Sequence, residues 1–122
     1  MLFPGSIMPA LDNSGVKLTK LIKPLGRRRI FASVGELVLV SLKSVYPLKK
    51  VKKGTLHKAV VALSPLWRFR NGAHRVKNTL WSCVMLKKDG LSPRCTRIRA
   101  PVSMELYIHF QIRALILSPK IV

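Results

Sequence analysis

Hydrophobic and polar positions along residues 16–86 follow the pattern of short β-strands. The segment 16–23 (VKLTKLIK) alternates and then slips by one position before Leu21, which predicts a strand with a bulge. The segment 36–43 (ELVLVSLK) is apolar on both faces and rich in β-branched residues, which predicts a central strand. Further strands are predicted over 56–63, 79–86 and 97–102.

Glycine and proline residues separate these runs at turn-like intervals, and this spacing is typical of a small all-β sandwich or barrel. Residues 12–15 (DNSG) tolerate left-handed backbone and cap their own turns, so they predict a tight reversal just before the first of these strands. The chain has 122 residues, the size of one ordinary domain. We therefore expect a single domain over residues 1–122.

The dipeptide Asn71-Gly72 predicts a β-hairpin, because both central residues of a type I′ turn need positive φ. A two-residue turn would set Arg68 directly opposite Arg75, where the two charges repel unless a phosphate backbone lies over them. In this register one face of the hairpin carries the bases Arg68, Arg70, Arg75 and Lys77. The other face carries Trp67 and Phe69, which fit either packing on the domain itself or contact with RNA or a neighbouring protein.

After Pro101 the apolar spacing changes from that of a strand to that of a helix. Ser103 can cap the helix and Glu105 suits its first turn, so we expect a helical segment over about 103–117 that ends before Pro119. The polar side of this segment carries few bases, unlike a helix that lies on a membrane. The chain also lacks the run of about 20 apolar residues that a membrane-spanning helix needs.

The composition combines a large positive charge with a core-forming apolar content. There are 23 Lys and Arg residues against 4 Asp and Glu, a net charge of +19, while 48% of the residues are hydrophobic. Disordered basic tails are poor in apolar residues, so the chain is expected to fold. The polyanion that most often offsets such a charge is nucleic acid, and an anionic membrane is the weaker alternative.

Lysines concentrate around a predicted turn between two strands, with five of them in residues 49–58. Their flexible ammonium groups suit phosphate neutralisation, which fixes position without reading bases. Charge runs are often only solvated faces, but the charge of the whole chain favours nucleic acid here. The candidate RNA-binding residues are Arg27, Arg28, Arg29, Lys49, Lys50, Lys52, Lys53, Lys58, Arg68, Arg70, Arg75 and Lys77.

Residues that could support catalysis or metal binding are few and scattered. Cys83 and Cys95 form no CxxC pair, the three histidines are far apart, and neither a GxSxG nor a P-loop string occurs. Cys83 fits a buried position in a strand. We expect no enzyme, no metal and no cofactor. Two alternatives to RNA binding are left, a small basic membrane-surface or partner-binding module and, more weakly, a hydrolase using Ser, His and Asp residues.

Several sequence segments together resemble the universal ribosomal large-subunit protein fourteen family over essentially the whole chain. They are ALDNSGVK at 10–17, SVGELVLV at 33–40, VKKGTLHKAVV at 51–61, CVML at 83–86, TRIRAPVSMEL at 96–106 and LSPKIV at 117–122. The resemblance implies a closed five-stranded β-barrel with a projecting β-hairpin and short C-terminal α-helices. It also implies binding to large-subunit rRNA at the subunit interface, bridges to small-subunit rRNA and docking beside other large-subunit proteins.

The resemblance also implies roles for individual residues. The family's RNA-facing lysines match Lys52, Lys53 and Lys58, and its N-terminal turn matches Asn13, Ser14 and Gly15. A Thr-Arg pair and a helical base on its subunit-interface side match Thr96, Arg97 and Arg113. In bacterial-type members this region also receives a ribosome-silencing factor, so such a factor is a further expected partner.

The chain departs from the family pattern at three glycine positions. Cys95 and Ala100 stand where the family usually has glycine, which predicts altered turns on either side of the Thr-Arg pair, and Ser33 replaces another glycine. This drift toward apolar and cysteine content resembles organellar members. It predicts a protein of the mitochondrial ribosome, in the matrix, ahead of a plastid or the bacterial cytoplasm.

Overall fold

The computed structural model describes residues 2–26, 30–47, 49–70, 74–90, 92–106 and 119–122. These residues form strands in two antiparallel sheets. The strands are β1 (Ile7–Pro9), β2 (Val16–Pro24), β3 (Leu37–Val45), β4 (Leu56–Leu63), β5 (Arg68–Arg70), β6 (His74–Val76) and β7 (Ser82–Met85). The all-β fold class predicted from the alternation of apolar residues is therefore confirmed.

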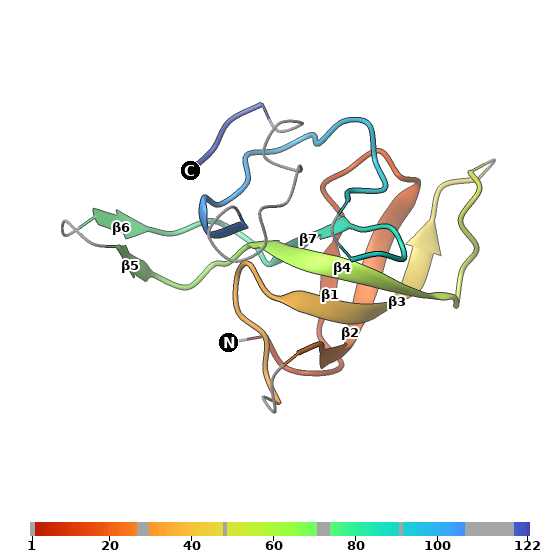
Figure 1. The fold of residues 1–122 in the computed structure, drawn as a ribbon, viewed down its shortest axis with the longest axis horizontal. Helices are drawn as coiled ribbons and strands as arrows, with labels where there is room; N and C mark the ends of the chain where they lie inside the picture. Colours follow the sequence, from red (N-terminus) through yellow and green to blue (C-terminus); the bar gives the residue numbers. More distant parts are fainter. Residues whose placement is uncertain (1, 27–29, 48, 71–73, 91, 107–118) are drawn as a thin grey trace.

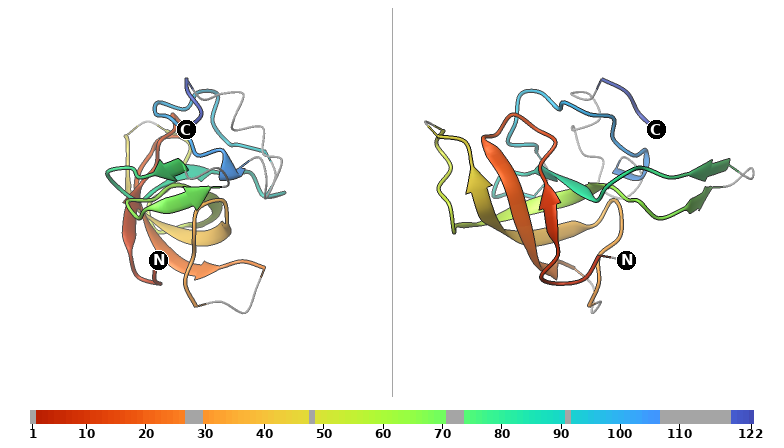
Figure 2. Two further views of the ribbon diagram at one scale, coloured as in Figure 1. Left: turned by 90° about the vertical axis from the view of Figure 1, so that its left-hand side faces the viewer. Right: turned by 180° about the vertical axis from the view of Figure 1, so that it is seen from behind.

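The larger sheet has five strands in the order β1-β2-β3-β4-β7 and curls into a half-barrel (Figures 1 and 2). Its two edge strands approach each other where the backbone N–H of Leu11 donates to the carbonyl of Cys83 at 3.0 Å. Ala10 and Cys83 form an isolated parallel bridge at the same place. Because no ladder joins β1 to β7 in the described residues, the closed barrel is not confirmed.

The strands of this sheet follow the predicted pattern closely. β4 coincides with the predicted segment 56–63, and β3 is the middle strand of the sheet, as predicted. The register of β2 against β3 shifts on either side of Leu21, which confirms the predicted bulge. β7 is shorter than the segment 79–86, and β1 was not predicted.

The core lies inside the curl of the sheet and beneath the segments that cross it. Its largest fully buried side chains are Met8, Leu21, Leu42, Met85, Leu86 and Leu106. β7 is buried along its whole length, because β4 pairs with one edge and the C-terminal segments cover the sheet here. Cys83 is fully buried as predicted, and burial raises the pKa of its thiol to about 12.

The predicted register of the hairpin is wrong. In the small sheet of β5 and β6, Arg70 pairs with His74 and Arg68 pairs with Val76, so residues 71–73 connect the strands in place of a two-residue turn. This slip by one residue sets Arg75 opposite Phe69 and removes the direct opposition of two arginines. The predicted face of four bases is therefore not formed. The hairpin does project from the main sheet (Figure 1).

The C-terminal segments form bridges, not a strand. Residues 97–102 were predicted as a strand, but Ile98 and Val102 only make isolated bridges, to Asp12 and Ile121. The helical segment predicted over about 103–117 falls largely on residues 107–118, outside the described part, and remains a prediction. Among the described residues, no helix is long and apolar enough to span a bilayer.

Candidate nucleic-acid interface

The turn at residues 12–15 is organised by the buried carboxylate of Asp12. Its Oδ1 accepts hydrogen bonds from the backbone N–H and the hydroxyl of Ser14, and its Oδ2 accepts the backbone N–H of Met85 at 2.8 Å. Only 3% of Asp12 is exposed, so its negative charge is engaged inside the protein. The predicted reversal is confirmed. Because the Asp12 carboxylate is bonded inside the protein, it adds no negative charge to the outer surface of the turn.

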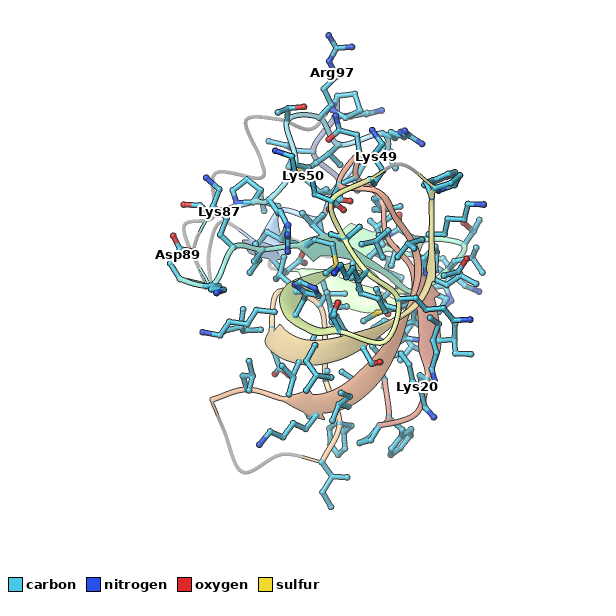
Figure 3. The ribbon with its side chains drawn as sticks, turned by 90° about the vertical axis from the view of Figure 1, so that its right-hand side faces the viewer. Lys20, Lys49, Lys50, Lys87, Asp89 and Arg97 are labelled. Carbon is cyan, nitrogen blue, oxygen red and sulfur yellow. The ribbon has the colours of Figure 1, made fainter. Side chains whose placement is uncertain are left out.

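Asn13 joins this turn to the Thr96-Arg97 pair. Its Oδ1 accepts the backbone N–H groups of Thr96 and Arg97 at 3.1 and 3.2 Å, and its Nδ2 donates to Oγ1 of Thr96 at 2.8 Å. The backbone N–H of Asn13 donates in turn to the carbonyl of Arg97. The backbone of Arg97 is thus held from both sides, while its side chain is exposed and projects outward (Figure 3).

The lysine turn, residues 49–55, connects β3 to β4. Lys49, Lys50, Lys52 and Lys53 are all exposed. Val51 among them is only 6% exposed and belongs to the core, and Thr55 donates its hydroxyl to the carbonyl of Lys52 at 2.6 Å. The buried Val51 and several hydrogen bonds, including backbone bonds of Gly54 and Thr55 with Leu42, therefore hold the turn while four ammonium groups face solvent.

Lys58 is placed differently from the other four lysines. It lies on β4, is half-buried, and donates from Nζ to the carbonyl of Lys88 at 3.0 Å. Its amine is therefore directed to the loop after β7 and away from the lysine turn. The prediction that all five lysines fan outward together holds for the four turn residues only.

A close contact at Gly15 brings the lysine turn against the N-terminal turn. Gly15 has a φ of 99°, and a Cβ built there would lie 2.6 Å from Cβ of Lys49. Only glycine combines this left-handed conformation with so close an approach. A surface hollow of about 430 Å³ marks the place where these segments meet; it is lined by Asn13, Ser14, Lys49, Lys50, Val51, Arg94, Cys95 and Thr96.

The contact between His57 and Arg94 could not be predicted from the sequence pattern. Nη1 of Arg94 donates to Nδ1 of His57 at 2.9 Å, so the imidazole proton lies on Nε2 and donates to Oγ1 of Thr55 at 2.8 Å. Burial lowers the pKa of His57 from its ordinary value, and the Arg94 charge lowers it further. This chain of hydrogen bonds ties the segment after β7 to the lysine turn.

Together, these contacts form one basic face from segments distant in sequence. Figure 3 shows Lys49, Lys50 and Arg97 at the same end of the molecule, with Lys20 far from them. In the described residues, no group of three or more His, Cys, Asp and Glu side chains could hold a metal ion. Exposed lysine and arginine side chains on one face are suited to binding phosphates through their charge.

Comparison with known families identifies the kind of protein that carries this face. The chain matches the family Ribosomal protein L14p/L23e over residues 1–122. The chain belongs to this family. The family consists of structural proteins of the large ribosomal subunit and not of enzymes, so the predicted family and the non-enzymatic class are confirmed. Its members are expected to bind rRNA and other proteins within that subunit.

The remaining predicted residues are spread over the molecule. Arg75 and Lys77 are exposed, and Nζ of Lys77 lies 5.5 Å from the ring centroid of the exposed Trp67, which is not packed on the domain. Figure 1 shows their hairpin on the opposite side of the main sheet from the lysine turn. The side chains of Arg68, Arg70 and Phe69, together with residues Arg27, Arg28, Arg29 and Arg113, lie outside the described part.

The departure at Cys95 lies at the candidate interface itself. Cys95 lines the hollow next to Thr96 and is only 8% exposed. Burial, together with the nearby Asp12 charge, raises the pKa of its thiol to about 11. Cys95 therefore serves as a packed neutral side chain where a thiolate would be unfavourable.

Proposed function

We propose that this chain is an rRNA-binding structural constituent of the large ribosomal subunit that lies at the subunit interface and helps form bridges to the small subunit. Family membership supports the ribosomal assignment. The single observation that carries the proposal is that the lysine turn and the segment just before Arg97 meet around one hollow, which is lined by Lys49, Lys50, Arg94 and Thr96 among others. This contact gives the molecule one continuous basic face with two differently presented sets of cations.

The lysine turn is the part proposed to bind large-subunit rRNA. Its four exposed ammonium groups can neutralise several neighbouring phosphates, and flexible lysines need no fixed RNA geometry to do so. Lys58 and the predicted bases of the hairpin, Arg68, Arg70, Arg75 and Lys77, would extend this contact to other RNA segments. The predicted Arg27, Arg28 and Arg29 belong to the same proposal.

Thr96, Arg97 and Arg113 are proposed to contact small-subunit rRNA. Asn13 bonds to both the N–H and the carbonyl of Arg97, which holds the backbone of Arg97 in place. The side chain of Arg97 points away from the molecule (Figure 3). A planar guanidinium so held is suited to bidentate phosphate contacts with an RNA that arrives after the subunit is built. The same surface would receive the ribosome-silencing factor, which then competes with subunit joining.

Charge reversal at this patch tests the proposed bridge. Replacing Arg97 and Arg113 by Glu should leave the protein in large subunits but reduce joining to small subunits, because like charges then face each other across the interface. Sucrose-gradient profiles of cells carrying the variant measure both effects. Lys20→Glu is the control, since it reverses a charge far from Arg97. Absence of the folded double variant from large subunits would assign the patch to the subunit's own RNA and contradict the bridge.

We further propose that the ribosome concerned is mitochondrial. The reason is the apolar and cysteine content at the positions where this chain departs from the family pattern. Cell fractionation tests this: the protein should sediment with matrix ribosomes and not with cytosolic or plastid ones. The alternative of a small basic membrane-surface or partner-binding module has no specific observation in its favour.

A further inference from the structure

Tyr46 is an exposed aromatic ring at the edge of the basic face. It follows the end of β3, and its backbone N–H donates to the carbonyl of Gly15 at 2.8 Å. Its side chain is 40% exposed, and Nζ of Lys17 lies 4.5 Å from its ring centroid. The backbone bond anchors the residue, the Lys17 amine lies over its ring, and the exposed ring offers a planar aromatic surface.

The ring of Tyr46 lines a hollow of its own, separate from the one beside Thr96. This hollow measures about 300 Å³ and is lined by Asp12, Asn13, Gly15, Tyr46, Pro47, Lys49 and Arg99. Its volume is at the lower end of the range for small-molecule pockets, which suits a single flat ring better than a larger group. Lys17 is not among the residues that line it.

The polar side chains of the hollow are already committed to bonds within the protein. Asp12 accepts hydrogen bonds through both carboxylate oxygens, and the carboxamide of Asn13 uses its oxygen and its nitrogen on Thr96 and Arg97. These bonds hold both side chains in place beside the ring. What the hollow offers a ligand is an aromatic surface and two exposed cationic side chains, Lys49 and Arg99.

We propose that the Tyr46 hollow holds one unpaired RNA base, stacked on the tyrosine ring, with its flanking phosphates neutralised by Lys49 and Arg99. The inference rests on the proposed rRNA binding. It specifies in addition that the RNA bound here presents an unpaired nucleotide. A base inside a duplex cannot stack on a side chain, so the RNA must present a bulged or loop nucleotide here. Stacking tolerates sequence changes because every base has a π-face, so the site accepts different bases.

A photo-crosslinking experiment tests this with a defined probe. The full-length protein is mixed with an RNA duplex that carries one bulged 5-iodouridine, and the crosslinked residue is identified by mass spectrometry. We expect the crosslink on Tyr46. Replacing the bulged base by an abasic site should weaken binding on the order of tenfold, within the range of base–aromatic stacking.

Variants of Tyr46 distinguish binding by base stacking from binding by the positive charge of the surface. Tyr46→Phe should retain the crosslink and the preference for the bulged base, whereas Tyr46→Leu should lose both while still binding RNA. Phe3→Leu removes another exposed ring, on the segment that pairs with Ala32 beyond the other end of β3, and should change neither. A crosslink on other residues, or equal affinity of wild type for the base and abasic RNAs, would overturn the stacking site alone. Failure of every probe to bind would instead contradict the proposed rRNA binding.

Discussion

Asn13 makes long-range connections in the candidate interface, because its carboxamide bonds to residues 83 and 84 positions away. These bonds fix the backbone from which Arg97 projects. Neither the turn at residues 12–15 nor residues 94–99 belongs to a regular strand in the structure. The side-chain bonds of Asn13, together with the isolated Asp12–Ile98 bridge, therefore provide the positioning that a sheet ladder provides elsewhere.

Removal of the Asn13 carboxamide should destabilise the protein and loosen Arg97. Asn13→Ala leaves two backbone donors without this partner and is expected to lower the free energy of unfolding by about 1–2 kcal/mol. Asn13→Asp keeps the acceptor oxygen and should cost less. Urea denaturation measures both, with Asn78→Ala as a control at an asparagine away from the interface. Equal stability of Asn13→Ala and wild type would contradict the positioning role.

His57 predicts a pH dependence of stability. Its pKa is lowered in the folded state, so below its ordinary value of about 6.5 the unfolded chain takes up a proton that the folded chain does not. The free energy of unfolding should therefore fall as the pH falls from about 6.5, and level off below the lowered pKa. Protonation would also put two donors face to face at the Arg94 contact.

Urea denaturation between pH 8 and pH 5 isolates this contribution when wild type is compared with His57→Gln. The variant should show a shallower loss of stability on acidification, because the other two histidines contribute equally to both proteins. The same pH dependence in both proteins would mean that the Arg94–His57–Thr55 chain of hydrogen bonds carries no proton linkage.

At the scale of elements, a strand can be predicted when the residues that specify it are neighbours in the sequence. β4 was predicted with its bounds, because its apolar run lies between Gly54 and Pro65. β1 was missed: it has three residues, ends in Pro9 and pairs only at the sheet edge, where a missing N–H is tolerated. The contacts of Asn13 and His57 depend on segments far apart in sequence, which periodicity does not report.

The hairpin shows a local signal overridden by cross-strand contacts. Asn71-Gly72 favours a two-residue turn, but that register places Arg68 against Arg75. The observed register pairs Arg75 with Phe69 and leaves residues 71–73 as a three-residue connection, the next most common hairpin length. The observed register therefore does not place two like charges directly opposite each other.

The hairpin should be dispensable for folding but not for assembly. Its two strands form a separate sheet that pairs with no strand of the main sheet in the described residues. Replacing residues 67–77 by a tight turn should therefore leave the main sheet folded and weaken incorporation into large subunits. Circular dichroism and a gradient profile of the same variant measure the two properties. Loss of the fold would show that the segment supports the core.

At the scale of the whole molecule, excess charge sets the strength and salt dependence of RNA binding. With a net charge of +19, contacts to about 6–10 phosphates are expected from the lysine turn and the hairpin bases. Affinity for large-subunit rRNA should then fall on the order of a thousandfold between 50 and 200 mM salt. A filter-binding series measures this, and an affinity that barely changed with salt would contradict phosphate neutralisation as the main source of binding.

The central claim is that the lysine turn holds this chain in the large ribosomal subunit. The most direct measurement is the sucrose-gradient distribution of the tagged protein and of a variant with Lys49, Lys50, Lys52 and Lys53 changed to Glu. A matched control carries the same change of charge at Lys20, Lys43, Lys87 and Lys88. The account predicts that wild type and control sediment with large subunits while the folded lysine-turn variant stays at the top of the gradient. Wild type at the top, in fractions that float with anionic vesicles, or a lysine-turn variant that still enters large subunits, would contradict it.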